Sequence, residues 1–448
     1  MPVPVPLRRA YCQAATHHPT VLHTLPTSTL SSAATRPTHH LRSDCRACGG
    51  ANLRRFLELG PQPLANAFPR STSEFASEKR YPLDVYFCER CALVQLLDVI
   101  DAEVLFRDYI YVTGTSDTIA AHNVKYAQAV VDRLGLGPDD LVVEIASNDG
   151  SLLSCFERHG VRTLGIEPAT NIAAIAAERG IETVNRFFDA EVAADVLDSH
   201  GSARAVIGNN VFAHVDDSLG FLRGCRDLIS DDGLVIIEAP YLGEMMDKLE
   251  YDTVYHEHLC YFSVTALRTL CESAGLSLVA IDRVPVHGGS IRMYAGRRER
   301  YPEHSAGALA MIQEEETLGL TTFGRFERFA SDVEANRRDL WALLERLLGE
   351  GKTVVGYGAP AKGNTLLNYC AIGTGTLPYT VDKSTLKVGR YTPGMHLPVR
   401  PATTILEEQP DYVMILAWNF ADEIMRQQRE YAERGGHFII PIPSPRIV

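Results

Sequence analysis

Four cysteines in the first quarter of the chain have the type and spacing of a metal site. They form two Cys-x-x-Cys pairs, Cys45 with Cys48 and Cys88 with Cys91, separated by 39 residues at 49–87. Two such pairs can supply four thiolates to one tetrahedral zinc ion, although this intervening segment is longer than in a compact zinc ribbon. Because sulfur would fill every ligand position, we expect a structural zinc rather than a catalytic one. Four unrelated buried or redox cysteines are the alternative.

The densest group of reactive side chains lies at 251–261, which holds three tyrosines, two histidines and two carboxylates. Histidine titrates near neutral pH, and a neighbouring carboxylate orients the ring and adjusts its basicity. The group therefore suits general acid–base catalysis, with His256 and His258 as candidate bases. The His-x-His pattern around Glu257 would also suit a metal ion, so the residues alone leave both roles open.

A glycine-rich turn near the C-terminus could bind phosphate. Residues 356–361 read Gly-Tyr-Gly-Ala-Pro-Ala, which fits the permissive dinucleotide pattern Gly-x-Gly-x-x-Ala, and Asp382 follows at the spacing of a ribose-binding acid. Taken alone, the turn permits a nicotinamide cofactor. Its backbone N–H groups and Lys362 would equally suit any diphosphate. Residues 362–364 lack the Gly-Lys-Ser/Thr ending of a P-loop.

Strand-like and helix-like segments alternate in two blocks, at 126–300 and 351–448, and must position these residues. Such alternation predicts parallel sheets flanked by helices. The first block has predicted strands at 141–146, 162–166, 204–208 and 233–240. A turn of small residues follows the first strand, where a ligand could approach a helix N-terminus, and Glu167 after the second strand could bind ribose hydroxyls.

The order of these strands, turns and acids resembles a class I S-adenosylmethionine-dependent methyltransferase, an α/β fold with a Rossmann-like sheet. The resemblance implies that the first turn holds the methionine end of the cofactor and that the second-strand acid holds the ribose. The first turn lacks Gly-x-Gly-x-x-Gly, which disfavours a nicotinamide there. The implied cofactor-binding residues are Glu144, Ser147, Asn148, Asp149, Gly150, Glu167 and Asn210.

From about residue 43 to 448 the chain resembles the deoxysugar C-methyltransferases of antibiotic biosynthesis, such as those of the tylosin, novobiocin and tetronitrose pathways. These enzymes methylate dTDP-linked 4-keto sugars. The resemblance rests on the two cysteine pairs and, in order, on GPQPLAN at 60–66, SNDG at 147–150, YHEH at 255–258, HGGSIR at 287–292 and GYGAPAKGN at 356–364. It implies zinc-binding, methyltransferase and C-terminal Rossmann-like domains that enclose the sugar nucleotide.

The resemblance also assigns roles around an enolate formed beside the ketone, with C3 expected ahead of C5 as the methylated carbon. His258 is the expected base, and Glu257 and Tyr255 shape its surroundings. Tyr109 and His214 are expected near the enolate oxygen as donors, unless they serve only as a packing residue and a helix cap. The expected substrate contacts are Arg292, Gly358, Lys362 and Asn364.

We therefore expect an α/β chain in five parts. These are a disordered tail at 1–42, a zinc-binding domain at 43–125, a methyltransferase domain at 126–300, a connecting helix at 301–350 and a substrate-binding domain at 351–448. The tail is rich in Pro, Thr, Ser, Ala and His, and it lacks the apolar stretch of a secretory signal.

Composition excludes several classes of protein. There are 43 basic and 56 acidic residues, so the net charge is −13, which argues against coating nucleic acid. No apolar run is long enough for a membrane-spanning helix. Ten cysteines in 448 residues are too few for a disulfide scaffold. We expect a cytoplasmic monomer or homodimer. The alternatives are a nicotinamide-dependent sugar-nucleotide oxidoreductase and a non-enzymatic zinc-ribbon module that recruits a partner.

Overall fold

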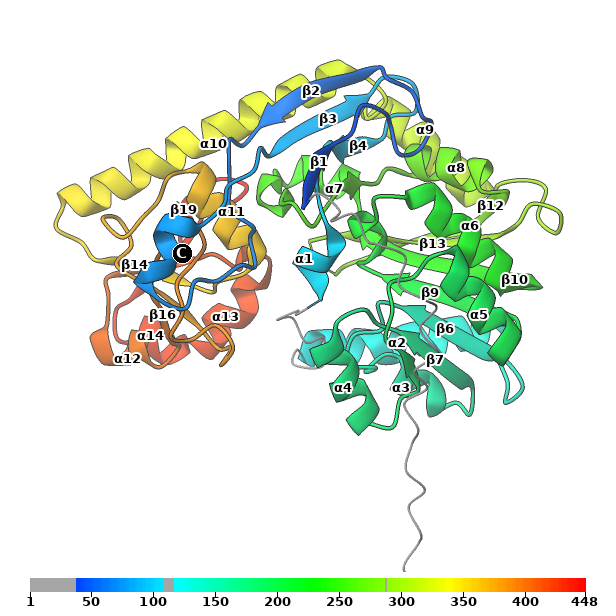
Figure 1. Cartoon of the computed structure of the whole chain (residues 1–448). Helices are drawn as coiled ribbons and strands as arrows, with labels where there is room; N and C mark the ends of the chain where they lie inside the picture. The colour runs from blue at the N-terminus through cyan, green and yellow to red at the C-terminus, as the bar shows by residue number, and fades with distance from the viewer. Residues whose placement is uncertain (1–37, 108–116, 287) are drawn as a thin grey trace, which may run out of the picture. The chain divides into compact units, whose positions relative to one another are not determined.

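Three larger β-sheets organise the residues that this computed structural model describes, which are 38–107, 117–286 and 288–448 (Figure 1). The N-terminal sheet is antiparallel, in the order β11-β4-β3-β2. Its strands are β2 (Leu53–Glu58), β3 (Asp84–Cys88), β4 (Val94–Leu96) and β11 (Cys260–Tyr261). The short strand β11 comes from the segment next to the two candidate bases, so the sheet joins parts of the chain far apart in sequence. Two short helices, η1 (Thr72–Ser77) and α1 (Ala102–Phe106), accompany it.

The central sheet has seven strands in the order β12-β13-β10-β9-β6-β7-β8. Every residue of β6 is buried, as an internal parallel strand requires. The parallel strands are β6 (Leu141–Ile145), β7 (Arg162–Ile166), β8 (Thr183–Val184), β9 (Ala203–Asn209) and β10 (Ile229–Pro240). Strands β12 (Leu276–Val284) and β13 (Ser290–Arg297) are antiparallel to their neighbours. The expected α/β fold class is confirmed.

Helices connect these strands, and several begin at a side-chain cap. Asp189, Asp217 and Ser263 each accept a hydrogen bond from a backbone N–H of the first turn. The helices are α2 (Asp117–Leu134), α3 (Leu153–Glu157), α4 (Thr170–Glu178), α5 (Ala190–His200), α6 (Ser218–Leu228), α7 (Leu242–Asp247) and α8 (Val264–Ser273). Two 3-10 turns, η3 (Phe212–His214) and η4 (Tyr251–Thr253), carry residues of the candidate site.

The expected single helix at 301–350 is two helices. Helix α9 (Ala306–Thr317) ends before Gly319, whose φ is 77°, and α10 (Phe323–Gly349) begins after that turn. Glycine adopts this left-handed conformation without steric cost, so it suits the break. Figure 1 shows α10 running along β2, and the two elements are in contact. The segment therefore covers the N-terminal sheet as well as connecting two blocks.

The C-terminal sheet has the order β16-β15-β14-β17-β18-β19 and is parallel except for β19. Its first strand, β14, lies between β15 and β17, so the strand order reverses there. Ligands bind at such a point in open α/β sheets. The strands are β14 (Val354–Tyr357), β15 (Thr380–Asp382), β16 (Val399–Pro401), β17 (Tyr412–Ile415), β18 (His437–Ile440) and β19 (Arg446–Ile447). The helices are α11 (Ala361–Tyr369), α12 (Thr404–Glu408), η5 (Trp418–Phe420), α13 (Ala421–Gln427) and α14 (Arg429–Glu433).

Part of the expected tail is ordered. Strand β1 (His39–Leu41) pairs antiparallel with β5 (Asp98–Ile100), and the His39 ring hydrogen-bonds to the Asp98 carboxylate at 2.8 Å. The rest of that expectation, at 1–37, lies outside the described residues. Among the helices that the structure describes, none has the length and apolarity to cross a membrane.

The packing of α10 on the N-terminal sheet predicts the effect of a core substitution. Phe326 is fully buried, and its ring centroid lies 4.6 Å from that of Phe87 and 5.0 Å from that of Phe56. We expect Phe326→Ala to lower the free energy of unfolding by about 3–5 kcal/mol because it leaves a cavity. Chemical denaturation measures this, with Arg328→Ala on the exposed face of α10 as the control. Equal stability of the two variants would contradict the packing.

Candidate active site and zinc centre

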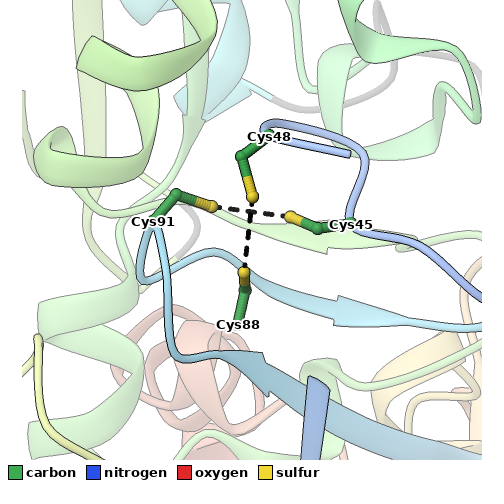
Figure 2. A group of neighbouring side chains, drawn as sticks. All are labelled: Cys45, Cys48, Cys88 and Cys91. Carbon is green, nitrogen blue, oxygen red and sulfur yellow. Dashed lines mark hydrogen bonds between the residues drawn. The ribbon is translucent and has the colours of Figure 1, made fainter. Parts of the chain in front are cut away.

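The four predicted cysteines converge on one point (Figure 2). Their sulfur atoms all lie within 4.8 Å of one another, with Cys45 Sγ 3.5 Å from Cys91 Sγ and Cys48 Sγ 3.6 Å from Cys88 Sγ. Zinc–sulfur bonds of about 2.3 Å in a tetrahedron put sulfurs about 3.8 Å apart, so the group fits a zinc ion closely. Hydrogen bonds among the thiols lower the pKa of Cys45 and raise the pKa of Cys88 and Cys91, so the thiols share protons that a zinc ion would displace.

The turn after β6 has several residues in the left-handed backbone region. Ala146, Asn148 and Gly150 have φ angles of 55°, 50° and 72°. A Cβ on Gly150 would lie 2.7 Å from Ile181, so no larger residue fits there. The N–H of Asn148 donates to Glu167 Oε2 at 2.9 Å, which ties this turn to the end of β7. The turn and the second-strand acid, predicted separately, therefore form one structure.

Three buried acids surround this turn: Glu144, Asp149 and Glu167. Burial raises the pKa of Glu144 well above its usual range, and the nearby carboxylates of Asp149 and Glu167 raise it further. Within the described residues, neither Glu144 Oε2 nor the Ser147 hydroxyl has a hydrogen-bond partner, although both are buried. Such atoms need a partner. The ammonium and ribose hydroxyls of S-adenosylmethionine supply donors of this kind, so the residues fit that cofactor.

The end of β9 adds amide groups to the same edge of the sheet. Asn209 Oδ1 is buried and lacks a hydrogen-bond partner in the part of the chain that the structure describes. Asn210 has a φ of 54°, and its N–H donates to the Glu238 carbonyl at 2.8 Å. The predicted residue Asn210 thus lies on a fixed backbone beside the neighbouring strand β10.

The two candidate bases have different surroundings. The Nδ1 atom of His258 lies 2.9 Å from the Thr253 carbonyl, which can only accept, so Nδ1 carries the hydrogen. The neutral ring then has its lone pair on Nε2, to which the Tyr255 hydroxyl donates at 2.7 Å. His256 is buried, and its Nε2 lies 3.1 Å from the Pro82 carbonyl of the N-terminal part. The basic nitrogen of His258 therefore lies at the Tyr255 hydroxyl, whereas Nδ1 of His256 is buried without a hydrogen-bond partner among the described residues.

Of the remaining predicted catalytic residues, His214 lies beside His258, whereas Glu257 contacts another part of the chain. The His214 ring stacks on the His258 ring with centroids 5.1 Å apart, and burial lowers the pKa of His214 to about 4, so it is neutral at pH 7. Glu257 is buried and accepts a hydrogen bond from Asn66 Nδ2 at 2.7 Å. Tyr109 lies outside the described residues.

A small pocket opens beside His258. Its lining is mostly apolar and comes from Ala213, Pro240, Tyr241, Leu242, Met245 and Tyr261, together with Thr253 and Cys260. Apolar walls exclude water and so strengthen hydrogen bonds formed inside.

Three of the four predicted substrate contacts form hydrogen bonds or ion pairs with other residues of the protein. Lys362 Nζ lies 2.9 Å from Glu250 Oε2, and Asn364 Nδ2 donates to the Ala65 carbonyl at 2.8 Å. Gly358, with a φ of 89°, turns the chain after β14. Arg292 is buried on the central sheet, where its guanidinium donates to Glu238 at 2.7 and 2.9 Å. These residues do not form one group, and their contact with substrate stays a prediction.

Comparison with known proteins shows the family of this chain. Family models match residues 45–106 as a zinc binding domain, 120–281 as a methyltransferase domain and 285–443 as a C-methyltransferase C-terminal domain. The C-methyltransferase NovU of Streptomyces niveus is 38% identical over 405 residues, which cover 90% of this chain and 96% of the relative. The chain belongs to the C-methyltransferase family.

This C-methyltransferase uses S-adenosylmethionine and has an N-terminal zinc-binding domain, as predicted from its sequence. Family membership decides against the oxidoreductase and the non-enzymatic zinc module. Solved structures with fold likeness include a magnesium protoporphyrin IX methyltransferase from Synechocystis PCC 6803 with bound S-adenosylmethionine. It is 14% identical, has a TM-score of 0.31, and the alignment covers 40% of this chain and 82% of that one.

Sequence reasoning missed a group of residues that contact the turn η4. Asp252 is buried, and Trp418 Nε1 donates to its Oδ2 at 2.7 Å. Asn336 Oδ1 accepts from the Tyr251 hydroxyl at 2.9 Å. No local pattern could have revealed these pairs, because the partners are 166 and 85 residues apart.

The cysteine geometry predicts one zinc ion per chain, measurable by elemental analysis. We expect Cys88→Ser to bind much less zinc and to unfold at lower temperature, because structural zinc binding contributes about 10–16 kcal/mol to folding. Cys155→Ser, outside the group, is the control and should keep its zinc. Full zinc content in the Cys88 variant would contradict the site.

The environment of Asp252 predicts a pH dependence. Burial raises its pKa to about 6 although Lys362 opposes the shift. The folded protein holds this proton more tightly than the unfolded chain. Its contribution to stability is therefore present below about pH 4 and is lost as pH rises through 6. We expect the unfolding free energy of Asp252→Asn to gain about 2 kcal/mol relative to that of wild type between pH 4 and pH 7. Denaturation curves at both pH values measure the difference in unfolding free energy between the variant and wild type. The same difference at both pH values would contradict the raised pKa of Asp252.

Proposed function

We propose that this C-methyltransferase methylates C3 of a dTDP-linked 4-keto deoxysugar, with His258 as the base. The supporting observation is the pair of hydrogen bonds on the His258 ring, because they leave the basic lone pair on Nε2, and His258 is one of the residues that line the small pocket. A neutral imidazole in that tautomer is the form needed to take a proton at neutral pH.

Carbon must become nucleophilic before it can accept a methyl group. A ketone at C4 makes the hydrogen on C3 acidic. His258 Nε2 removes that proton, and the electron pair of the C–H bond passes into an enolate. S-adenosylmethionine supplies the electrophilic methyl group, which the enolate carbon takes as the sulfonium leaves as a thioether.

The Tyr255 hydroxyl has a defined part in this proposal. In the structure it donates to the nitrogen that must receive the C3 proton. When the substrate C–H takes that place, the hydroxyl can donate to the enolate oxygen instead. A donor aimed at developing negative charge lowers the barrier, and its loss costs about 100- to 1000-fold in similar sites. Tyr109 and His214 are the other proposed donors.

The remaining assignments follow the same proposal. The turn at 147–150, with Glu144, Glu167 and Asn210, would hold the cofactor. Lys362, Gly358, Asn364 and Arg292 would meet the substrate. We propose domains at 43–125, 126–300 and 351–448, which the matched ranges 45–106, 120–281 and 285–443 support.

An isotope experiment tests the base directly. In deuterated solvent without methyl donor, the wild type should exchange the C3 hydrogen of a dTDP-4-keto sugar, and labelled donor should then give a carbon-bound methyl group. We expect His258→Asn to lose both reactions by about 100-fold or more while it still binds S-adenosylmethionine. His256→Asn is the comparison, because its Nε2 lies at the Pro82 carbonyl and its ring packs against Tyr81.

Different outcomes would overturn different parts of the proposal. Normal exchange by the His258 variant would exclude it as the base. Exchange at C5 would move the methylated carbon but keep the base. Absence of methyl transfer across a panel of dTDP-4-keto sugars would exclude the substrate class.

A further inference from the structure

One arginine links the zinc centre to the loop beside His258. Arg46 lies between the ligands Cys45 and Cys48, and no part of its side chain is exposed. Its guanidinium does not point at the surface. Nη1 donates to Gln95 Oε1 at 3.1 Å and to the Leu96 carbonyl, which holds the arginine on strand β4.

The rest of the guanidinium reaches Asp216, 170 residues away in sequence. Arg46 Nε and Nη2 lie 3.1 and 3.0 Å from Asp216 Oδ1. Arg42 Nη1 also donates to this oxygen at 3.1 Å, and His40 Nε2 lies 3.5 Å from the other carboxylate oxygen. Three basic side chains from the N-terminal part therefore meet one carboxylate of the central part.

Asp216 belongs to the segment 209–217, which reaches the reaction centre. His214, two residues before it, stacks between His258 and Phe106, with ring centroids 5.1 and 5.3 Å away. The Ala213 carbonyl accepts the N–H of Leu259 at 2.7 Å, next to His258. Movement of Asp216 would therefore move the ring against which His258 packs.

We propose that Arg46 is a positioning residue through which the zinc centre orients His214 and His258. The zinc ion fixes the backbone on both sides of Arg46, and the guanidinium then fixes the segment 209–217 through Asp216. The part that concerns turnover rests on the proposed function, whereas the part that concerns the segment does not.

Loss of the arginine should leave the protein folded. Asp216 is about one third exposed and keeps Arg42, so Arg46→Met does not leave a charge that is both buried and unpaired. Arg46→Lys keeps the charge but not the forked geometry. Asp216→Asn leaves the zinc ligands and Arg46 unchanged and weakens the contact between Arg46 and Asp216 from the other side. Arg54→Met, a half-exposed arginine on β2 paired with Glu89, is the matched control.

The experiment compares zinc content, hydrogen exchange of 209–217 and steady-state kinetics in the full chain. We expect Arg46→Met and Asp216→Asn to keep their zinc, and backbone N–H groups at 211–217 to exchange about tenfold faster than in wild type. With a keto sugar that the wild-type enzyme methylates, kcat should fall by about 100-fold while KM changes little, because a misplaced base slows the reaction. Arg46→Lys should recover part of kcat, and Arg54→Met should match wild type in every measurement.

Wild-type exchange at 211–217 and wild-type kcat in both variants would overturn the proposal. If Arg46→Met loses zinc, the Asp216→Asn variant decides between the two roles. Wild-type hydrogen exchange at 211–217 in that variant would mean that Arg46 supports only the zinc site. Exchange and zinc content need no substrate. Failure to find a methylated sugar would therefore count against the proposed function, not against this link.

Discussion

The hydrogen bond from His258 Nδ1 to the Thr253 carbonyl constrains the whole candidate site, because it determines which ring nitrogen carries the lone pair. That carbonyl is held by other elements. Asn336 of α10 binds the Tyr251 hydroxyl, and Thr365 of α11 donates to the Val254 carbonyl at 3.1 Å. The tautomer of one ring thus depends on residues about 80 to 110 positions further along the chain.

The charged residues around η4 also connect the candidate site to the C-terminal part of the chain. Lys362 neutralises Glu250 and lies near Asp252, whose carboxylate also receives the Trp418 N–H. Removing any one partner would leave a buried charge with less compensation, which is unfavourable in a low-dielectric interior. A diphosphate that reached Lys362 would compete with Glu250 for it. Substrate contact and the geometry of the base would then share one cluster of charges.

Most of the sequence predictions that the structure matches rest on patterns of residues close together in the chain. The four cysteines, the buried strands and the turn at 147–150 each depend on residues close in sequence, and the structure has them as expected. The break at Gly319 shows the limit, since a helix-favouring composition hides one left-handed residue.

Long-range pairs could not be predicted. The residues alone, apart from the family resemblance, do not separate His256 from His258, because the two rings differ in their contacts with the Pro82 and Thr253 carbonyls. Arg292 is an expected substrate contact, but the register of β13 against β10 puts it opposite Glu238. Pairing of this kind depends on tertiary register, which leaves no periodic signal in one sequence.

Strand β11 has a consequence for protein engineering. Its two residues complete one edge of the N-terminal sheet by pairing with Gln95 and Val94. A fragment cut off after the cysteine pairs would expose that edge, and unpaired strand edges promote aggregation. Chimeric enzymes that exchange the zinc-binding portion should therefore take the later segment with it, since that segment supplies the edge strand of the sheet despite the long stretch of sequence between them.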